Sequence, residues 1–155
     1  MSDEAYQAMM VLKELWTLDK RIDEAYERIA QVREMATRAT SSFKAANISG
    51  TGSRSRVEDA VIRMDQLEKQ LDANIERMVR RRQLCQQAIE FMDGHNAERE
   101  RRIIELRYID HRKWSDIMRR MHFELSQSKR IHEDALCNFW RQWKKMDQNG
   151  PFFLL

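Results

Sequence analysis

Apolar residues recur along the first forty positions of the chain at alternating spacings of three and four. The positions that share this spacing are Ala8, Val11, Leu15, Leu18, Ile22, Ala25, Ile29, Val32, Ala36 and Ala39. Charged residues fill the intervals, a pattern typical of the a and d positions of a coiled coil. A long helix with one apolar stripe is not stable alone. The stripe therefore predicts a partner helix, either in the same chain or in a second subunit.

A second, less regular run of apolar positions follows. Its members are Val57, Ala60, Met64, Leu67, Leu71, Met78, Cys85 and Met92, and the register is interrupted at Asn74 and Arg81. Residues 40–56, between the two runs, are rich in Ser, Gly and Thr. Such a composition predicts a flexible connection. We expect residues 1–93 to form two long coiled-coil-like helices, as a hairpin or as an arm that pairs with another subunit.

The pattern changes after Gly94, a residue that suits the left-handed position at the end of a helix. Asn96 can cap the helix that follows. Apolar faces then predict three short helices over about 96–109, 113–121 and 125–146, while residues 147–155 form an apolar tail ending in "PFFLL". The predicted fold is all-α, with a long helical hairpin or coiled-coil arm followed by a small three-helix domain at 94–146.

Composition and charge refine this picture. The chain contains only 4 Gly and 1 Pro in 155 residues, which favours helix throughout. Residues 1–93 hold 15 Lys and Arg against 16 Asp and Glu, whereas residues 94–146 hold 13 against 8. The basic excess is therefore confined to the predicted three-helix domain. Such a patch suits a partner with a phosphate backbone.

Several classes of function are not expected. The opening "MSDEAYQAMM" has neither a basic n-region nor an apolar h-region, and no apolar run approaches the roughly 20 residues that span a bilayer. We expect a cytoplasmic protein that does not bind membranes, with reduced cysteines. The four His and two Cys lack metal-ligand spacing, and no nucleophile–base pair or phosphate-binding Gly loop is present. We expect no enzyme, no metal and no other cofactor.

The segment "ERERRIIELRYIDHRKWSDIMRRMHFELSQSKRIHEDAL", residues 98–136, resembles region four of bacterial sigma factors and the related helix-turn-helix of phage transcription regulators. The shared elements are the opening "ER" pair, "IIELRY", a helix with Trp114 and Ile117, a three-residue turn and "KRIHEDAL". In layout the whole chain is similar to ArpU- and RinA-like phage and prophage regulators. The resemblance implies a sequence-specific regulator that binds double-stranded DNA in the cytoplasm of a bacterial host. RNA polymerase and a second copy of the chain, paired through the long helices, are candidate partners.

In such a module, the helix starting near Leu125 would lie in the major groove. The side chains expected to read base edges are Ser126, Gln127, Lys129 and Arg130, and those expected to contact phosphates are Arg112, Lys113, Arg119 and Arg120. Each basic residue can equally belong to an ordinary solvated helix face. His132, beside the core face of the same helix, is expected to be a hydrogen-bonded packing residue.

The sequence departs from the usual module at three positions. His122 replaces the common turn glycine, so either it adopts a strained left-handed conformation or the turn differs. Glu124 replaces the usual capping Ser, which leaves Ser126 as a candidate cap, and Ser128 replaces an apolar core residue.

Two other functions stay open. One is a small-terminase-like DNA-packaging protein that assembles into a ring. The other is a helical protein-binding adaptor without DNA binding, which the acidic Glu124, Glu133 and Asp134 near the predicted DNA face would favour.

Overall fold

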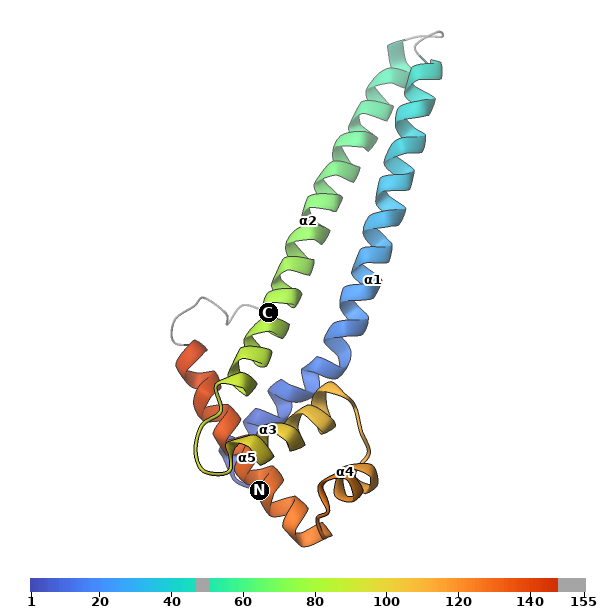
Figure 1. Cartoon of the computed structure of the whole chain (residues 1–155). Coiled ribbons are helices and arrows are strands. Elements are labelled where there is room, and N and C mark those ends of the chain that lie inside the picture. The colour runs from blue at the N-terminus through green and yellow to red at the C-terminus, as the bar shows by residue number, and fades with distance from the viewer. Residues whose placement is uncertain (47–50, 148–155) are drawn as a thin grey trace. The chain divides into compact units, whose positions relative to one another are not determined.

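The computed structural model describes residues 1–46 and 51–147 and, within them, contains helices and no strand, so the all-α prediction is confirmed. None of the described helices combines the length and the apolar character required to cross a membrane. The elements in chain order are α1 (Asp3–Ala46), α2 (Thr51–Glu90), α3 (Ala97–Ile104), a π-helical segment η1 (Glu105–Ile109), α4 (Trp114–Met121) and α5 (Leu125–Asp147) (Figure 1).

The two long helices extend further than the composition indicated. We predicted a flexible connection over residues 40–56, but α1 continues to Ala46 and α2 begins at Thr51. Within α1 the polar side chains are accommodated by bonds to the preceding turn: the Thr40 hydroxyl donates to the Ala36 carbonyl at 2.9 Å, and the Ser41 hydroxyl donates to that of Thr37 at 3.0 Å. Residues 47–50 of the predicted connection, and all but Asp147 of the predicted tail, lie outside the described residues.

The chain divides into two compact units, of which one is Lys20–Val79. Its core contains Ala25 and Ile29 of α1 and Ile75 of α2, with three partly buried side chains of α2 packed against them. The Arg33 guanidinium donates to the Glu68 carboxylate at 2.6 Å. Positions further along α1 thus meet earlier positions of α2, so the helices are antiparallel. In this unit, the apolar stripe of α1 is therefore buried against α2 of the same chain.

The other unit joins Met1–Asp19 to the chain from Arg80 onward. Its large buried side chains come from every element: Leu12 on α1, Cys85 and Ile89 on α2, Ile103 and Ile104 on α3, Leu106 and Tyr108 on η1, Ile117 on α4, and Leu136 and Phe139 on α5. Arg81 and Arg82 of α2 form ion pairs of 2.6 Å with Glu14 and Asp19 of α1. The start of α1 and the end of α2 therefore share a core with the short helices, and the compact units divide the chain differently from the predicted boundary at residue 93.

The segment before α3 follows the sequence prediction in part. Gly94 has a φ of 109°, the positive value for which glycine is suited. Asn96 occupies the position preceding α3, but its side chain makes no capping bond and instead accepts a hydrogen bond from Arg99 at 2.8 Å. Asn96 therefore precedes α3 as predicted, but its side chain does not cap the helix.

Helices α4 and α5 are joined by residues 122–124, as expected for a helix-turn-helix (Figure 1). His122 has φ 55° and ψ 43°, so the strained left-handed alternative is the one observed. The backbone N–H of Phe123 donates to the Met118 carbonyl at 3.0 Å and closes the turn. Because α5 already begins at Leu125, Ser126 lies inside its first turn and is not the N-cap.

Candidate nucleic-acid interface

The first two turns of α5 present a polar face with three exposed members, Ser126, Lys129 and Arg130. Spacings of three and four place these side chains on one side of the helix. Gln127 is half-buried at the edge of this face. Among the residues that the structure describes, none of the four side chains has a hydrogen-bond or ion-pair partner. No described residue of the chain therefore pairs with the predicted base-reading residues, and three of them are exposed while Gln127 is half-buried.

The opposite face of α5 is fixed by the core. Ile131, Ala135 and Leu136 are buried there, and His132 is only 8% exposed. Tyr108 Oη and His132 Nε2 are hydrogen-bonded at 2.9 Å, and the Trp114 ring meets the imidazole edge-on with ring centres 4.7 Å apart. Burial lowers the pKa of His132 to about 4, so its ring is neutral at pH 7. The prediction that His132 is a hydrogen-bonded packing residue is confirmed.

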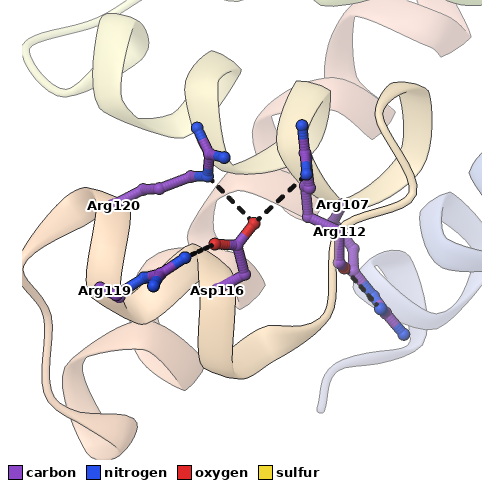
Figure 2. A network of polar contacts seen from close by, with 5 residues as sticks. All are labelled: Arg107, Arg112, Asp116, Arg119 and Arg120. Atoms are coloured by element: carbon purple, nitrogen blue, oxygen red, sulfur yellow. Dashed lines mark hydrogen bonds and ion pairs between the residues drawn. The ribbon is translucent and has the colours of Figure 1, made fainter.

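Three of the four predicted phosphate-contacting residues converge on one carboxylate. Figure 2 shows Arg112, Arg119 and Arg120 directed toward Asp116, a set that we call the Asp116 cluster. The distances from guanidinium nitrogen to carboxylate oxygen are 2.6 Å for Arg119, 3.0 Å for Arg120 and 3.7 Å for Arg112. The fourth residue, Lys113, is exposed just before α4 and takes no part in the cluster.

Hydrogen bonds from Arg119 and Arg120 lower the pKa of Asp116, so the carboxylate stays ionised. One negative charge against three guanidinium groups leaves the cluster positive. Each guanidinium carries five N–H donors, and all three side chains are exposed, so donors are left for a phosphate. The cluster therefore combines fixed geometry with a positive surface.

Arg107 ties the cluster to the start of α1. Its guanidinium lies over the rings of Trp16 and Trp114, at 5.0 and 5.4 Å from their centres. It also donates a hydrogen bond of 2.9 Å to the backbone carbonyl of Arg112, the contact drawn in Figure 2. Arg107 thereby holds the segment from which the Arg112 side chain projects.

Arg120 also belongs to a shallow groove of about 440 Å³ at the start of α3, which it shares with Arg99 and Arg102. Glu98 is the one acidic residue among the described residues that line the groove. Sequence reasoning assigned no role to Arg99 or Arg102, because only the folded chain brings α3 beside the end of α4. The positive surface around Arg120 therefore reaches beyond the predicted residues.

Sequence reasoning also missed Asp116, Arg107 and Trp16. Asp116 could have been found, because it lies four residues after Arg112 and three and four before Arg119 and Arg120. The contact of Trp16 with Arg107 joins residues far apart in the chain, and no local pattern indicates it.

No protein-family model, no curated protein and no solved structure matches this chain. The resemblance to sigma region four and to phage regulators therefore stays a prediction.

Proposed function

We propose that the protein is a sequence-specific, double-stranded DNA-binding transcription regulator of phage or prophage type. The observation that carries this proposal is the exposed face of Ser126, Lys129 and Arg130 on the second helix of a helix-turn-helix. The Asp116 cluster, on and just before the preceding helix α4, supports it, because a DNA-binding helix-turn-helix uses such residues to contact the DNA backbone beside the groove.

In this proposal, the first turns of α5 enter the major groove, which is about 12 Å wide. Lys129 and Arg130 have the donors that recognise guanine, and Gln127 has the donor and acceptor that recognise adenine. The exposed Arg112, Lys113, Arg119 and Arg120 bind phosphates on either side. RNA polymerase and a second copy of the chain are proposed as partners in control of transcription.

Asp116 has two opposed effects on DNA binding. Its carboxylate orients three guanidinium groups, which favours binding to backbone oxygens. The same carboxylate adds a negative charge that the DNA phosphates repel, and this lowers affinity for every sequence alike.

Acidic side chains favour a second candidate, a protein-binding adaptor without DNA binding. Asp134 is exposed on α5, and Glu133 is engaged by the backbone N–H of Ser2 at 2.7 Å. Asp116 neutralises part of the basic surface in the same region. An acidic or mixed protein surface could bind here in place of DNA.

Selection of bound fragments from a random DNA pool, followed by anisotropy titrations over a range of salt concentrations, tests the proposal. We expect one enriched motif. The logarithm of the association constant should fall linearly with the logarithm of the salt concentration, with a slope of about −0.9 for each phosphate neutralised. Arg130→Ala should reduce the preference for the motif, whereas Arg119→Ala should weaken binding to all sequences and lower the salt slope by about one. Arg38→Ala, an exposed arginine of the Lys20–Val79 unit paired with Glu34, is the matched control and should leave both unchanged.

If the folded protein shows no salt-sensitive DNA binding and no enriched motif, the regulator proposal fails and the adaptor is favoured. Analytical ultracentrifugation, which measures the oligomeric state, distinguishes a regulator from a DNA-packaging protein. A monomer or dimer fits a regulator, whereas a large closed ring would favour a packaging protein of small-terminase type.

A further inference from the structure

A cavity of about 380 Å³ opens within the unit that contains the helix-turn-helix. Its lining comes from the start of α1, η1, α4 and the start of α5, and includes the apolar or aromatic side chains of Met9, Tyr108, Trp114 and Leu125. Pockets for small organic molecules have volumes of roughly 300 to 1,000 Å³ and mostly apolar walls with a few polar groups. The volume and the partly apolar lining of this cavity therefore suit a small organic ligand.

The charged residues of this cavity are all cationic. Lys13, Arg107 and Lys129 line it, and no carboxylate is found among its described lining residues. Lys13 and Lys129 are exposed and have no ion-pair partner in the described part of the chain. The Arg107 guanidinium is already placed over the Trp114 ring. Uncompensated positive charge beside aromatic surface is suited to an anion with an aromatic body.

Ser128 supplies an independent observation. It also lines the cavity and is only 1% exposed, and its Oγ has no hydrogen-bond partner among the described residues. Buried hydroxyls are nearly always hydrogen-bonded, because an unpaired one costs about 1–3 kcal/mol. The neighbouring polar pair, Tyr108 and His132, is satisfied internally. Ser128 Oγ is thus an unpaired donor and acceptor, buried next to a cationic, aromatic cavity.

We propose that this cavity binds a small aromatic carboxylate. The carboxylate is held by Lys13 and Lys129, and the aromatic ring packs beside Trp114. A rotation of the Ser128 side chain about its Cα–Cβ bond turns the buried hydroxyl toward the ligand, to which it then hydrogen-bonds. The site shares Lys129 with the proposed base-reading face, but its existence does not depend on DNA binding and its test requires no DNA.

Isothermal titration calorimetry of the full chain with 2-naphthoate tests the proposal, with 2-naphthamide as an uncharged ligand of the same shape. We expect saturable one-to-one binding of the naphthoate and at least about tenfold weaker binding of the amide, since the ion pairs are lost. Lys13→Gln and Lys129→Gln should each weaken naphthoate binding about fivefold to tenfold. Lys69→Gln, an exposed lysine of the other unit paired with Asp65, should leave it unchanged.

Ser128→Leu should abolish binding by filling the cavity. Thermal unfolding followed by circular dichroism establishes whether this variant folds. If it does not, the two lysine variants carry the test, because their side chains are exposed and outside the core. The proposal is overturned by absence of saturable binding, by equal affinity for the acid and the amide, or by unchanged affinity in both lysine variants.

Discussion

The buried imidazole of His132 makes a quantitative prediction about acid stability. Burial is the main cause that lowers its pKa to about 4, the positive charge of Arg107 adds to the effect, and Glu133 opposes it. In the unfolded chain the ring regains its ordinary value of about 6.5. Between these two values the unfolded state binds a proton that the folded state does not. Folding is therefore progressively penalised as the pH falls from 6.5 to 4, and the loss is complete below 4.

The size of this loss follows from the two pKa values. A difference of one unit corresponds to about 1.4 kcal/mol, so the span from 6.5 to about 4 corresponds to roughly 3 kcal/mol. Domains of ordinary stability unfold with only about 5–15 kcal/mol. A single histidine thus accounts for a large share of the acid sensitivity expected of this unit.

Urea unfolding at pH 7 and pH 4.5, followed by circular dichroism, measures the effect. His132→Phe keeps a ring beside Trp114 but cannot be protonated, so the fall in unfolding free energy between the two pH values should be about 2–3 kcal/mol smaller than in the wild type. At pH 7 the variant itself should be less stable by about 1–3 kcal/mol, because the buried Tyr108 hydroxyl loses its partner.

Tyr108→Phe is the matched control. It removes the hydrogen bond but leaves His132 buried, so its pH dependence should resemble that of the wild type. If His132→Phe and the wild type lose stability equally on acidification, the imidazole is not held neutral in the folded protein and the reasoning is refuted. If Tyr108→Phe removes the pH dependence, the hydrogen bond rather than burial controls the titration.

Three further predictions address the candidate site and its support. Asp116→Asn removes the carboxylate that pairs with Arg119 and Arg120. Because both guanidinium groups are exposed, we expect the lost repulsion of the phosphates to outweigh the lost orientation, so affinity for DNA of any sequence should rise several-fold in anisotropy titrations, with a steeper salt dependence. Unchanged or weaker binding would show that orientation by Asp116 is the larger effect. Ile117→Ala should lower the unfolding free energy by about 2–5 kcal/mol in urea titrations, because this side chain is fully buried and lies midway along α4. A loss below about 1 kcal/mol would show that α4 is not packed as described. His122→Gly should raise the melting temperature, since the left-handed conformation costs a non-glycine residue about 1–2 kcal/mol. An unchanged melting temperature would mean that the imidazole makes compensating contacts.

Local periodicity explains how much of the fold could be predicted. Every position of the predicted stripe in α1 is buried or half-buried, from Ala8 to Ala39. The helices predicted over 113–121 and 125–146 are observed as Trp114–Met121 and Leu125–Asp147. These segments have strongly one-sided apolar faces, and burial of such a face decides helical structure more firmly than composition does. The connection at 40–56 was predicted from composition alone, and there the structure differs most.

Contacts between distant segments lie beyond what a single sequence indicates. Trp16 falls outside the apolar stripe of α1, and nothing nearby in the sequence shows that it meets Arg107 and Tyr108. Ser128 was recognised as a polar residue at a core position, but its relation to a cationic cavity depends on four elements meeting in space. The exposed face of α5 could be predicted, because exposure follows from the helical period once the buried face is known.

The antiparallel register in the Lys20–Val79 unit restricts how this segment can change in length. Deleting residues from α1 alone would slide every later position past its neighbour on α2 and separate pairs such as Arg33 and Glu68. A deletion of seven residues from each helix would shorten both by about 10 Å and return the remaining apolar positions to the same facing side. Insertions and deletions tolerated in this segment should therefore come as matched heptads, one in each helix.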